Sequence, residues 1–152
     1  MKICKGFCFC IISIPVNFHS ILSFRMDILK FKKLSENAII PRRSSKYSAG
    51  LGLFSAESII IGGYDRAKVK TDIAAKLPYG TYGRIAPEPE LEINSFIGIG
   101  AGVIDADFTG NIECVIFNHS DNPFVITKGM KIAQLIIEQI LYPRIAEVDS
   151  LD

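Results

Sequence analysis

The chain has 152 residues, is 49% hydrophobic and carries a formal net charge of +1, from 17 Lys and Arg against 16 Asp and Glu. This length suits one domain that buries roughly two-thirds of its surface on folding. The balanced charge excludes a broad electrostatic field for nucleic acid or an anionic membrane. Three of the 4 cysteines, Cys4, Cys8 and Cys10, crowd the N-terminus, which excludes a disulfide framework across the domain.

The N-terminal segment, residues 1–25, differs in composition from the rest of the chain. Its lysines precede the apolar run GFCFCIISIPV, and the first acidic residue is Asp27. These features resemble a secretory signal or a mitochondrial presequence, but an A-x-A-like site is missing and Pro15 interrupts any helix. The run also falls short of the about 20 apolar residues of a membrane span. We predict an extension over 1–25, disordered or targeting, and one domain over 26–152. The predicted location is the cytoplasm or nucleus, or the mitochondrion if the extension is a presequence.

Period-two alternation marks the first predicted strand, AKVKTDIAAKL over residues 67–77. The segments TYGRIA, FIGIGAGVID, NIECVIFN, FVIT and IAQLIIEQIL follow, separated by PEPE, DFTG, SDNP and KGM. Short strands at this spacing, with Gly, Pro, Asn and Asp between them, are typical of an antiparallel sandwich or jelly roll. The sequence therefore predicts an all-β domain.

The segment IAQLIIEQIL, residues 132–141, fits two periods. The spacing of its leucine and isoleucine residues is compatible with a helix. Its β-branched content, and the flanking Gly129 and Pro143, favour a strand. We predict a strand.

Two glutamates flank a proline in RIAPEPELEIN, residues 84–94, where Glu88, Pro89 and Glu90 follow one another. Two neighbouring carboxylates are a common catalytic acid–base set. The local pattern also favours a helix start, because proline is accepted at the first helical position and acidic side chains complement the N-terminal dipole.

Glycines are dense in GIGAGVIDADFTG, residues 98–110. On one strand, Gly98, Gly100 and Gly102 would line a single face and leave the backbone bare, which is typical of close approach by a ligand or another chain. Peptide groups exposed in this way could pair with the edge of a planar base. The alternative is a tight β-bend with ordinary turn aspartates.

Several common mechanisms lack their parts in this sequence, including zinc-ligand spacing, a Walker loop and a Gly-rich turn between a strand and a helix. His119 lies in NHSDNP, where we interpret it as a solvated turn histidine. A nucleic-acid-binding sheet would interleave aromatic and basic residues, and Phe96, Phe108 and Phe117 have no such neighbours in sequence.

Four blocks follow one another along the chain: KLSENAIIPRRSSKYSAGLGLFSAE, VKTDIAAKLPYGTYGRIAP, GAGVIDADFTGNIECVIFN and KGMKIAQLI. In this order they resemble the trimeric dUTP diphosphatases, or dUTPases, and the resemblance covers roughly residues 26–151. The related dCTP deaminases share the fold, but GAGVIDADFTG sides with the dUTPases. The resemblance implies a β jelly-roll (β-clip) subunit and a homotrimer with active sites at the subunit interfaces. It also implies Mg²⁺-dependent hydrolysis of dUTP to dUMP and diphosphate.

The third motif of the family supplies the uracil contacts. In that motif the main chain of a hairpin pairs with uracil, and an aromatic ring, usually tyrosine, packs under the deoxyribose; Phe108 matches the ring. The substrate-binding residues implied here are Gly100, Ala101, Gly102, Val103, Ile104 and Phe108.

Two residues match catalytic positions of the family. Asp105 matches the aspartate that orients the attacking water, and a carboxylate beside a water can accept its proton as the α-phosphorus is attacked. Gln134 in KIAQLI matches the fourth-motif glutamine, which helps to hold the water and the phosphates.

Other positions depart from the family pattern. Gly52 stands at the first-motif aspartate, which engages the metal-bound phosphates through water, and Glu88, Pro89 and Glu90 stand at the second-motif Arg-Ser-Gly. The chain reaches Asp152 without a match to the fifth motif, a Gly-rich arm. Exchanging Arg for Glu near a phosphate changes its interaction by about 5 kcal/mol at an effective dielectric near 20, or roughly three to four decades in affinity.

These departures define a degenerate phosphate and Mg²⁺ site and leave three hypotheses open. The chain is a working dUTPase, a nonhydrolysing protein that binds a deoxyuridine nucleotide, or a pseudoenzyme with a structural or regulatory role. In the last case it enters a homotrimer or a mixed trimer with an intact relative.

Overall fold

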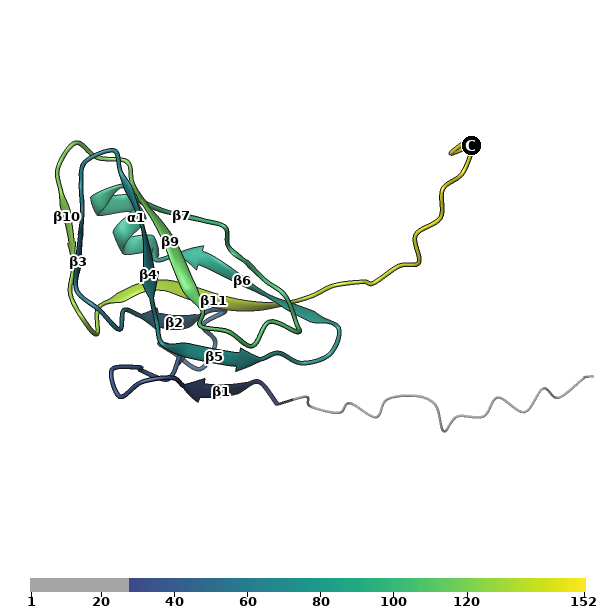
Figure 1. The fold of residues 1–152 in the computed structure, drawn as a ribbon, viewed down its shortest axis with the longest axis horizontal. Coiled ribbons are helices and arrows are strands. Elements are labelled where there is room, and N and C mark those ends of the chain that lie inside the picture. Colours follow the sequence, from purple (N-terminus) through teal and green to yellow (C-terminus); the bar gives the residue numbers. More distant parts are fainter. Residues whose placement is uncertain (1–27) are drawn as a thin grey trace, which may run out of the picture.

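The structure is a computed structural model that describes residues 28–152 (Figure 1). The predictions for residues 1–25 therefore lie outside the described residues, as does the predicted domain start at residue 26. Within residues 28–152, no helix is long and apolar enough to cross a membrane.

Strands and one short helix make up the ordered elements of the described part. In chain order they are β1 (Lys30–Lys33), β2 (Leu51–Phe54), β3 (Ile59–Ile61), β4 (Arg66–Lys70), β5 (Ile73–Lys76), β6 (Thr81–Pro87), α1 (Pro89–Ser95), β7 (Ile97–Gly100), β8 (Val103–Ile104), β9 (Glu113–Asn118), β10 (Phe124–Ile126) and β11 (Lys131–Gln139). The prediction of an all-β domain is confirmed.

The strands pair antiparallel throughout. The larger sheets have the orders β2-β11-β6-β8 and β4-β9-β7, and the smaller ones are β1-β5 and β10-β3. Beyond β11 the chain leaves the body of the molecule in an extended C-terminal segment (Figure 1). The predicted antiparallel arrangement is therefore correct.

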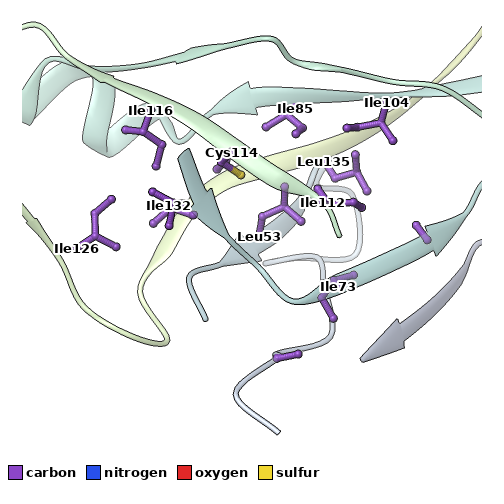
Figure 2. Close-up of a cluster of buried hydrophobic side chains, with 14 of the residues drawn as sticks. Leu53, Ile73, Ile85, Ile104, Ile112, Cys114, Ile116, Ile126, Ile132 and Leu135 are labelled. Carbon is purple, nitrogen blue, oxygen red and sulfur yellow. The ribbon is translucent and has the colours of Figure 1, made fainter. Parts of the chain in front are cut away.

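The hydrophobic core is built by both larger sheets (Figure 2). Along β9, Cys114 and Ile116 are buried, whereas their neighbours in sequence are partly exposed. Leu53 of β2, Ile85 of β6 and Leu135 of β11 meet them from the four-stranded sheet. Along β6, Gly83 and Ile85 are buried whereas Tyr82 and Arg84 are partly exposed, so the other face of the four-stranded sheet lies outside the core. We call it the outer face.

The predicted single strand over residues 67–77 is wrong, because the chain breaks at Asp72. This residue has a left-handed backbone with φ 51°, and the halves on either side join different sheets, β4 with β9 and β5 with β1. Its carboxylate accepts hydrogen bonds from Ser35 Oγ at 2.7 Å and Asn111 Nδ2 at 2.9 Å. These bonds hold a conformation that an aspartate adopts at some cost.

Two other local predictions are confirmed. The segment after Gly129 forms β11, which pairs with β2 on one side and β6 on the other and so occupies an interior position where β-branched residues pack well. Helix α1 begins at Pro89, with Glu90 and Glu92 in its first turn. The PEPE segment is thus a helix start rather than a simple turn.

Candidate functional site

A cavity of about 240 Å³ opens where β8 ends. We call it the Asp105 cavity. The chain from the β7–β8 corner through the following turn forms one wall, and strands β4 and β9 form the other. Its lining consists of Ala101, Val103, Ile104, Asp105, Phe108, Lys68, Asn111, Glu113 and Val115. Five residues predicted from the third motif therefore share one cavity, and Gly100 and Gly102 flank Ala101 at its corner.

The position of Asp105 follows from the short strand before it. Ile104 is buried and pairs with Gly83 of β6, which fixes the end of β8. The Phe108 amide then donates a hydrogen bond to the Asp105 carbonyl at 3.1 Å and closes a turn. The Phe108 ring remains 41% exposed and packs over Gly110, where a Cβ would lie 2.8 Å from the ring. An exposed ring beside a carboxylate can pack against the apolar body of a ligand while the carboxylate meets its polar groups.

The ionisable side chains of the Asp105 cavity carry more negative than positive charge. Lys68 Nζ lies 2.8 Å from Glu113 Oε2, so these two form an ion pair, and the Asp105 carboxylate adds a further negative charge. Ala101, Val103, Ile104 and Val115 supply an apolar lining. The cavity therefore suits an uncharged, partly apolar group better than a phosphate.

The predicted bare face of β7 is wrong, because side chains of the chain itself cover it. A Cβ at Gly100 would lie 2.5 Å from the Phe117 ring, and one at Gly98 would lie 2.7 Å from His119 Nε2. The two rings stack with centroids 5.9 Å apart and planes 6° apart. His119 is exposed, as predicted for a solvated turn histidine. Side chains do approach these glycines closely, but they belong to the same chain. They are Phe117 of β9 and His119, which follows β9.

The predicted single strand that places Gly102 on one face with Gly98 and Gly100 is wrong, because Ala101 and Gly102 form the corner where the chain passes from β7 in the three-stranded sheet to β8 in the four-stranded sheet. Ala101 has a left-handed backbone with φ 48°. The Ile85 amide donates to the Gly102 carbonyl at 2.7 Å, and a Cβ on Gly102 would lie 2.5 Å from the Ile85 oxygen. The Gly102 carbonyl is therefore engaged within the fold, and a larger residue would displace backbone at this corner.

A second polar group lies on the four-stranded sheet, around Glu88 and Lys131. Lys131 Nζ lies 2.9 Å from Glu88 Oε1, 2.8 Å from Oε2 and 3.4 Å from Ser44 Oγ. The Glu88 side chain is 14% exposed and that of Lys131 is 32% exposed. We call this group, with Gly52 and Gln134, the Glu88–Lys131 cluster. The predicted degenerate phosphate site thus contains an ion pair within the chain.

Gly52 lies under the Lys131 side chain. It is buried and pairs with Gln134 across β2 and β11, and a Cβ at Gly52 would lie 2.9 Å from Lys131 Cε. Lys131 therefore occupies space that a side chain at position 52 would need. A side chain at position 52 would therefore compete for space with Lys131 in the position where it pairs with Glu88.

Gln134 is fixed by its own chain. Its Nε2 donates to the Pro87 carbonyl at 3.0 Å, and a Cβ on Gly50 would lie 2.3 Å from Gln134 Oε1. Pro89 and Glu90, also predicted in the degenerate site, are exposed on the first turn of α1. Of the two glutamates, Glu88 alone joins the cluster.

The two predicted catalytic residues lie apart in a single chain. The register places Ile104, the residue before Asp105, opposite Gly83, which in turn pairs with Ile137, three residues beyond Gln134. With about 3.4 Å per residue and about 4.8 Å between strands, the Cα atoms of Ile104 and Gln134 are roughly 14 Å apart. In a single chain, the Asp105 cavity and the Gln134 side chain are therefore separate.

A further polar group, on β6 and β11, was not singled out in the sequence. On the outer face, Arg84 Nε lies 2.7 Å from Glu138 Oε1, and the Tyr82 hydroxyl donates to Glu138 Oε2. The hydrogen bonds from Tyr82 and Arg84 lower the pKa of Glu138, and the bond to Glu138 raises the pKa of Tyr82. The strands pair Tyr82 with Glu138, so only the β6–β11 register brings this group together.

The described residues do not fit a magnesium ion held by the protein. Mg²⁺ prefers oxygen ligands, usually carboxylates with substrate phosphates. No group of three His, Cys, Asp or Glu side chains within residues 28–152 is arranged to hold a metal. At the first-motif position, Gly52 supplies no carboxylate, and the Lys131 side chain lies over it.

A dUTPase family model matches residues 36–152. The chain belongs to the dUTPase family. It is 47% identical over 125 residues to the deoxyuridine 5'-triphosphate nucleotidohydrolase of Oryza sativa subsp. japonica, which covers 82% of this chain and 73% of that protein. It is 49% identical over 124 residues to the mitochondrial protein of that name in Homo sapiens, covering 82% of this chain and 49% of the human protein.

Solved dUTPase structures have the same fold. The dUTPase from phage phi11 of S. aureus superimposes with a TM-score of 0.78 at 28% identity, covering 83% of this chain and 99% of that chain. A mutant of the Staphylococcus bacteriophage 80alpha dUTPase with dUpNHpp gives 0.77 at 29% identity, covering 82% and 98%. The predicted family and the jelly-roll fold class are confirmed, and they place the chain among hydrolases of nucleotide metabolism.

Proposed function

We propose that this chain binds deoxyuridine nucleotides through the Asp105 cavity and hydrolyses dUTP far more slowly than an intact dUTPase. The cavity supports base and sugar binding, because it gathers Ala101, Val103, Ile104 and Phe108 beside the Asp105 carboxylate. The observation that carries the loss of hydrolysis is the Glu88 carboxylate on Lys131, at the place where relatives of this fold are expected to hold phosphates.

Asp105 keeps a geometry suited to its proposed role. Its carboxylate is exposed at the cavity, where it can accept a proton from a water that attacks the α-phosphorus. The developing charge on the phosphates then needs cationic or N–H donors. Glu88 brings a negative charge instead, and it neutralises Lys131. Proton removal is thus retained while stabilisation of the transferred phosphoryl group is weakened.

The charges that line the Asp105 cavity favour ligands with few phosphates. The Asp105 cavity has one cation and two carboxylates among its lining residues. We therefore expect deoxyuridine or dUMP to bind at least as well as dUTP. Magnesium enters this proposal only as an ion that the nucleotide brings, because the chain's own residues do not hold one. A mutant dUTPase from phage phi11 coordinates a structural Mg(II) ion, and this is a property of the phage protein.

A second copy of the chain is part of the proposal. Asp105 follows Ile104, whose Cα lies roughly 14 Å from that of Gln134 by strand spacing, so a complete site that uses both residues would need a second subunit. A homotrimer meets this need, and a mixed trimer with an intact relative is the alternative. Light scattering after size-exclusion chromatography measures the mass of the assembly, and a monomer would contradict this part of the proposal.

The cellular location depends on whether the N-terminal segment, residues 1–25, acts as a targeting signal. Relatives in Dictyostelium discoideum and Homo sapiens carry the word mitochondrial in their names. We propose the cytoplasm or nucleus for the domain, with mitochondrial import if residues 1–25 act as a presequence. Fluorescent fusions of the full chain and of residues 26–152 separate these locations.

Efficient dUTP hydrolysis is the second candidate function. It is favoured by the identity to named nucleotidohydrolases and by the presence of Asp105 and Gln134. A purely structural or regulatory subunit is the third, and it predicts no affinity for any deoxyuridine compound.

The binding proposal is tested by calorimetry with dUMP on the full chain and on two variants. Phe108→Ala removes the ring at the cavity, whereas Tyr79→Ala removes an aromatic residue that is 90% exposed and outside the cavity lining. We expect Phe108→Ala to weaken dUMP binding at least tenfold and Tyr79→Ala to change it less than twofold. Absence of dUMP binding, or equal loss in both variants, contradicts the proposal.

A further inference from the structure

Lys131 has no role assigned by the family resemblance, yet it is the cation at the centre of the Glu88–Lys131 cluster. Among residues 28–152, Glu88 supplies the one carboxylate in contact with it. Both carboxylate oxygens lie within 2.9 Å of Nζ, and the Ser44 hydroxyl lies 3.4 Å away on the same nitrogen. This is the arrangement of an ammonium group that binds an oxyanion.

The Glu88 carboxylate is held by this charge rather than by a full set of hydrogen bonds. Its Oε2 is buried and lies 2.8 Å from Nζ, with no other polar partner within the described part of the chain. Glu88 is also the residue before α1, but its side chain makes no capping bond to the helix. A buried acceptor without its hydrogen bonds is costly. The position of this carboxylate therefore depends on Lys131.

We propose that Lys131 and Ser44 form an oxyanion-binding site that the chain occupies with its own Glu88 carboxylate. Glu88 competes with phosphate-type anions for Lys131. Because Glu88 is part of the chain, it keeps these anions out of the site. This inference rests on the closed phosphate site of the proposed function and deepens it by assigning Lys131, Ser44 and Glu88; it does not require recognition of a base in the Asp105 cavity.

Glu88→Gln is the informative variant, because it keeps the shape of the side chain and removes its charge. Glu90→Gln is the matched control, since Glu90 lies two residues away, is exposed and does not contact Lys131. The probe is inorganic pyrophosphate without added metal, measured by calorimetry on the full-length chain. A unit charge at this distance changes affinity by more than tenfold at an effective dielectric near 20.

We expect Glu88→Gln to bind pyrophosphate at least tenfold more tightly than the unmodified chain, and Glu90→Gln to differ less than twofold. Adding Lys131→Met to Glu88→Gln should abolish the gain. Glu88→Ala should show the same gain, which keeps the test valid if the glutamine variant folds poorly. An equal gain in Glu90→Gln, or a gain that survives Lys131→Met, overturns the inference.

Pyrophosphate carries no base, so this result is independent of nucleotide binding in the Asp105 cavity. If dUMP fails to bind but Glu88→Gln gains affinity for pyrophosphate, the proposed function fails and the oxyanion site stands. If dUMP binds but Glu88→Gln gains no affinity, the oxyanion site is wrong and the binding proposal stands.

Discussion

Lys131 Nζ lies 2.8 and 2.9 Å from the two carboxylate oxygens of Glu88, and the Lys131 stem lies over Gly52. Positions 52 and 88 therefore both border the Lys131 side chain. A cation remains on this side of the sheet, but its charge is balanced within the chain. The four-stranded sheet accommodates this ion pair, so the fold does not require a free cation at this place.

Restoring Arg-Ser-Gly at positions 88–90 should restore affinity for the triphosphate. The variant Glu88→Arg, Pro89→Ser, Glu90→Gly removes two carboxylates, adds a guanidinium and frees backbone donors. We expect dUTP to bind at least a hundredfold more tightly, with a smaller change for dUMP, as measured by calorimetry without metal. The control is Glu92→Arg, which adds positive charge to the same helix turn. An equal gain in the control contradicts a specific phosphate site.

A carboxylate at position 52 should compete with Glu88 for Lys131. A Cβ there would lie 2.9 Å from the flexible end of Lys131, so Lys131 must shift. We expect Glu88→Gln to be less destabilising in a Gly52→Asp background than in the unmodified chain, with a coupling of about 1 kcal/mol. Urea unfolding of the four proteins in the cycle measures this coupling.

Gly52→Ala is the matched control for that cycle, because it adds the Cβ without the charge. Its coupling to Glu88→Gln should be close to zero. A coupling as large as that of Gly52→Asp would show that crowding of Lys131, and not its charge, connects the two positions.

Alanine at Gly100 should destabilise the fold through Phe117. The new Cβ would lie 2.5 Å from the Phe117 ring, so the ring that covers β7 must move. We expect a loss of about 1–3 kcal/mol in the free energy of unfolding. Gly62→Ala is the control, since its Cβ would meet nothing closer than 3.7 Å. Equal losses in both variants would mean that backbone flexibility, and not the ring, explains the glycine.

Cys114 should make stability fall at alkaline pH. Burial raises the pKa of its thiol from 9.0 to about 12, so the folded state keeps the proton that the unfolded state releases above pH 9. This contribution is complete below pH 9 and is lost as the pH rises toward 12, at roughly 1 kcal/mol per pH unit. Denaturant unfolding at several pH values should show a steeper fall for the unmodified chain than for Cys114→Ala. Identical slopes would contradict the effect.

Regular strands could be predicted from the sequence, whereas breaks and edges could not. Strands β9 and β11 carry clear patterns of buried residues and flanking turn residues, and both were predicted. The break at Asp72 was missed because the alternation continues through it and only the backbone angle changes. Strand β1 is largely exposed, so its residues show no contrast between two faces.

The candidate site also contains parts that could be predicted from the sequence and parts that could not. The residues around Asp105 follow one another in the chain, so local pattern and family resemblance were enough to place them together. The partners of the three ion pairs are distant in sequence. Glu88 and Lys131 are 43 residues apart and meet because β11 lies beside β6. Lys68 and Glu113 meet through the pairing of β4 with β9. These contacts depend on tertiary structure and could not be predicted from spacing.

The most direct test of a closed phosphate site is pyrophosphate release from dUTP by the unmodified full-length chain with Mg²⁺. We expect turnover near the uncatalysed background, together with measurable dUMP binding in the same preparation. Ordinary enzymes turn over roughly once per second or faster. Turnover of dUTP in that range by the unmodified chain would show that Glu88 does not close the phosphate site.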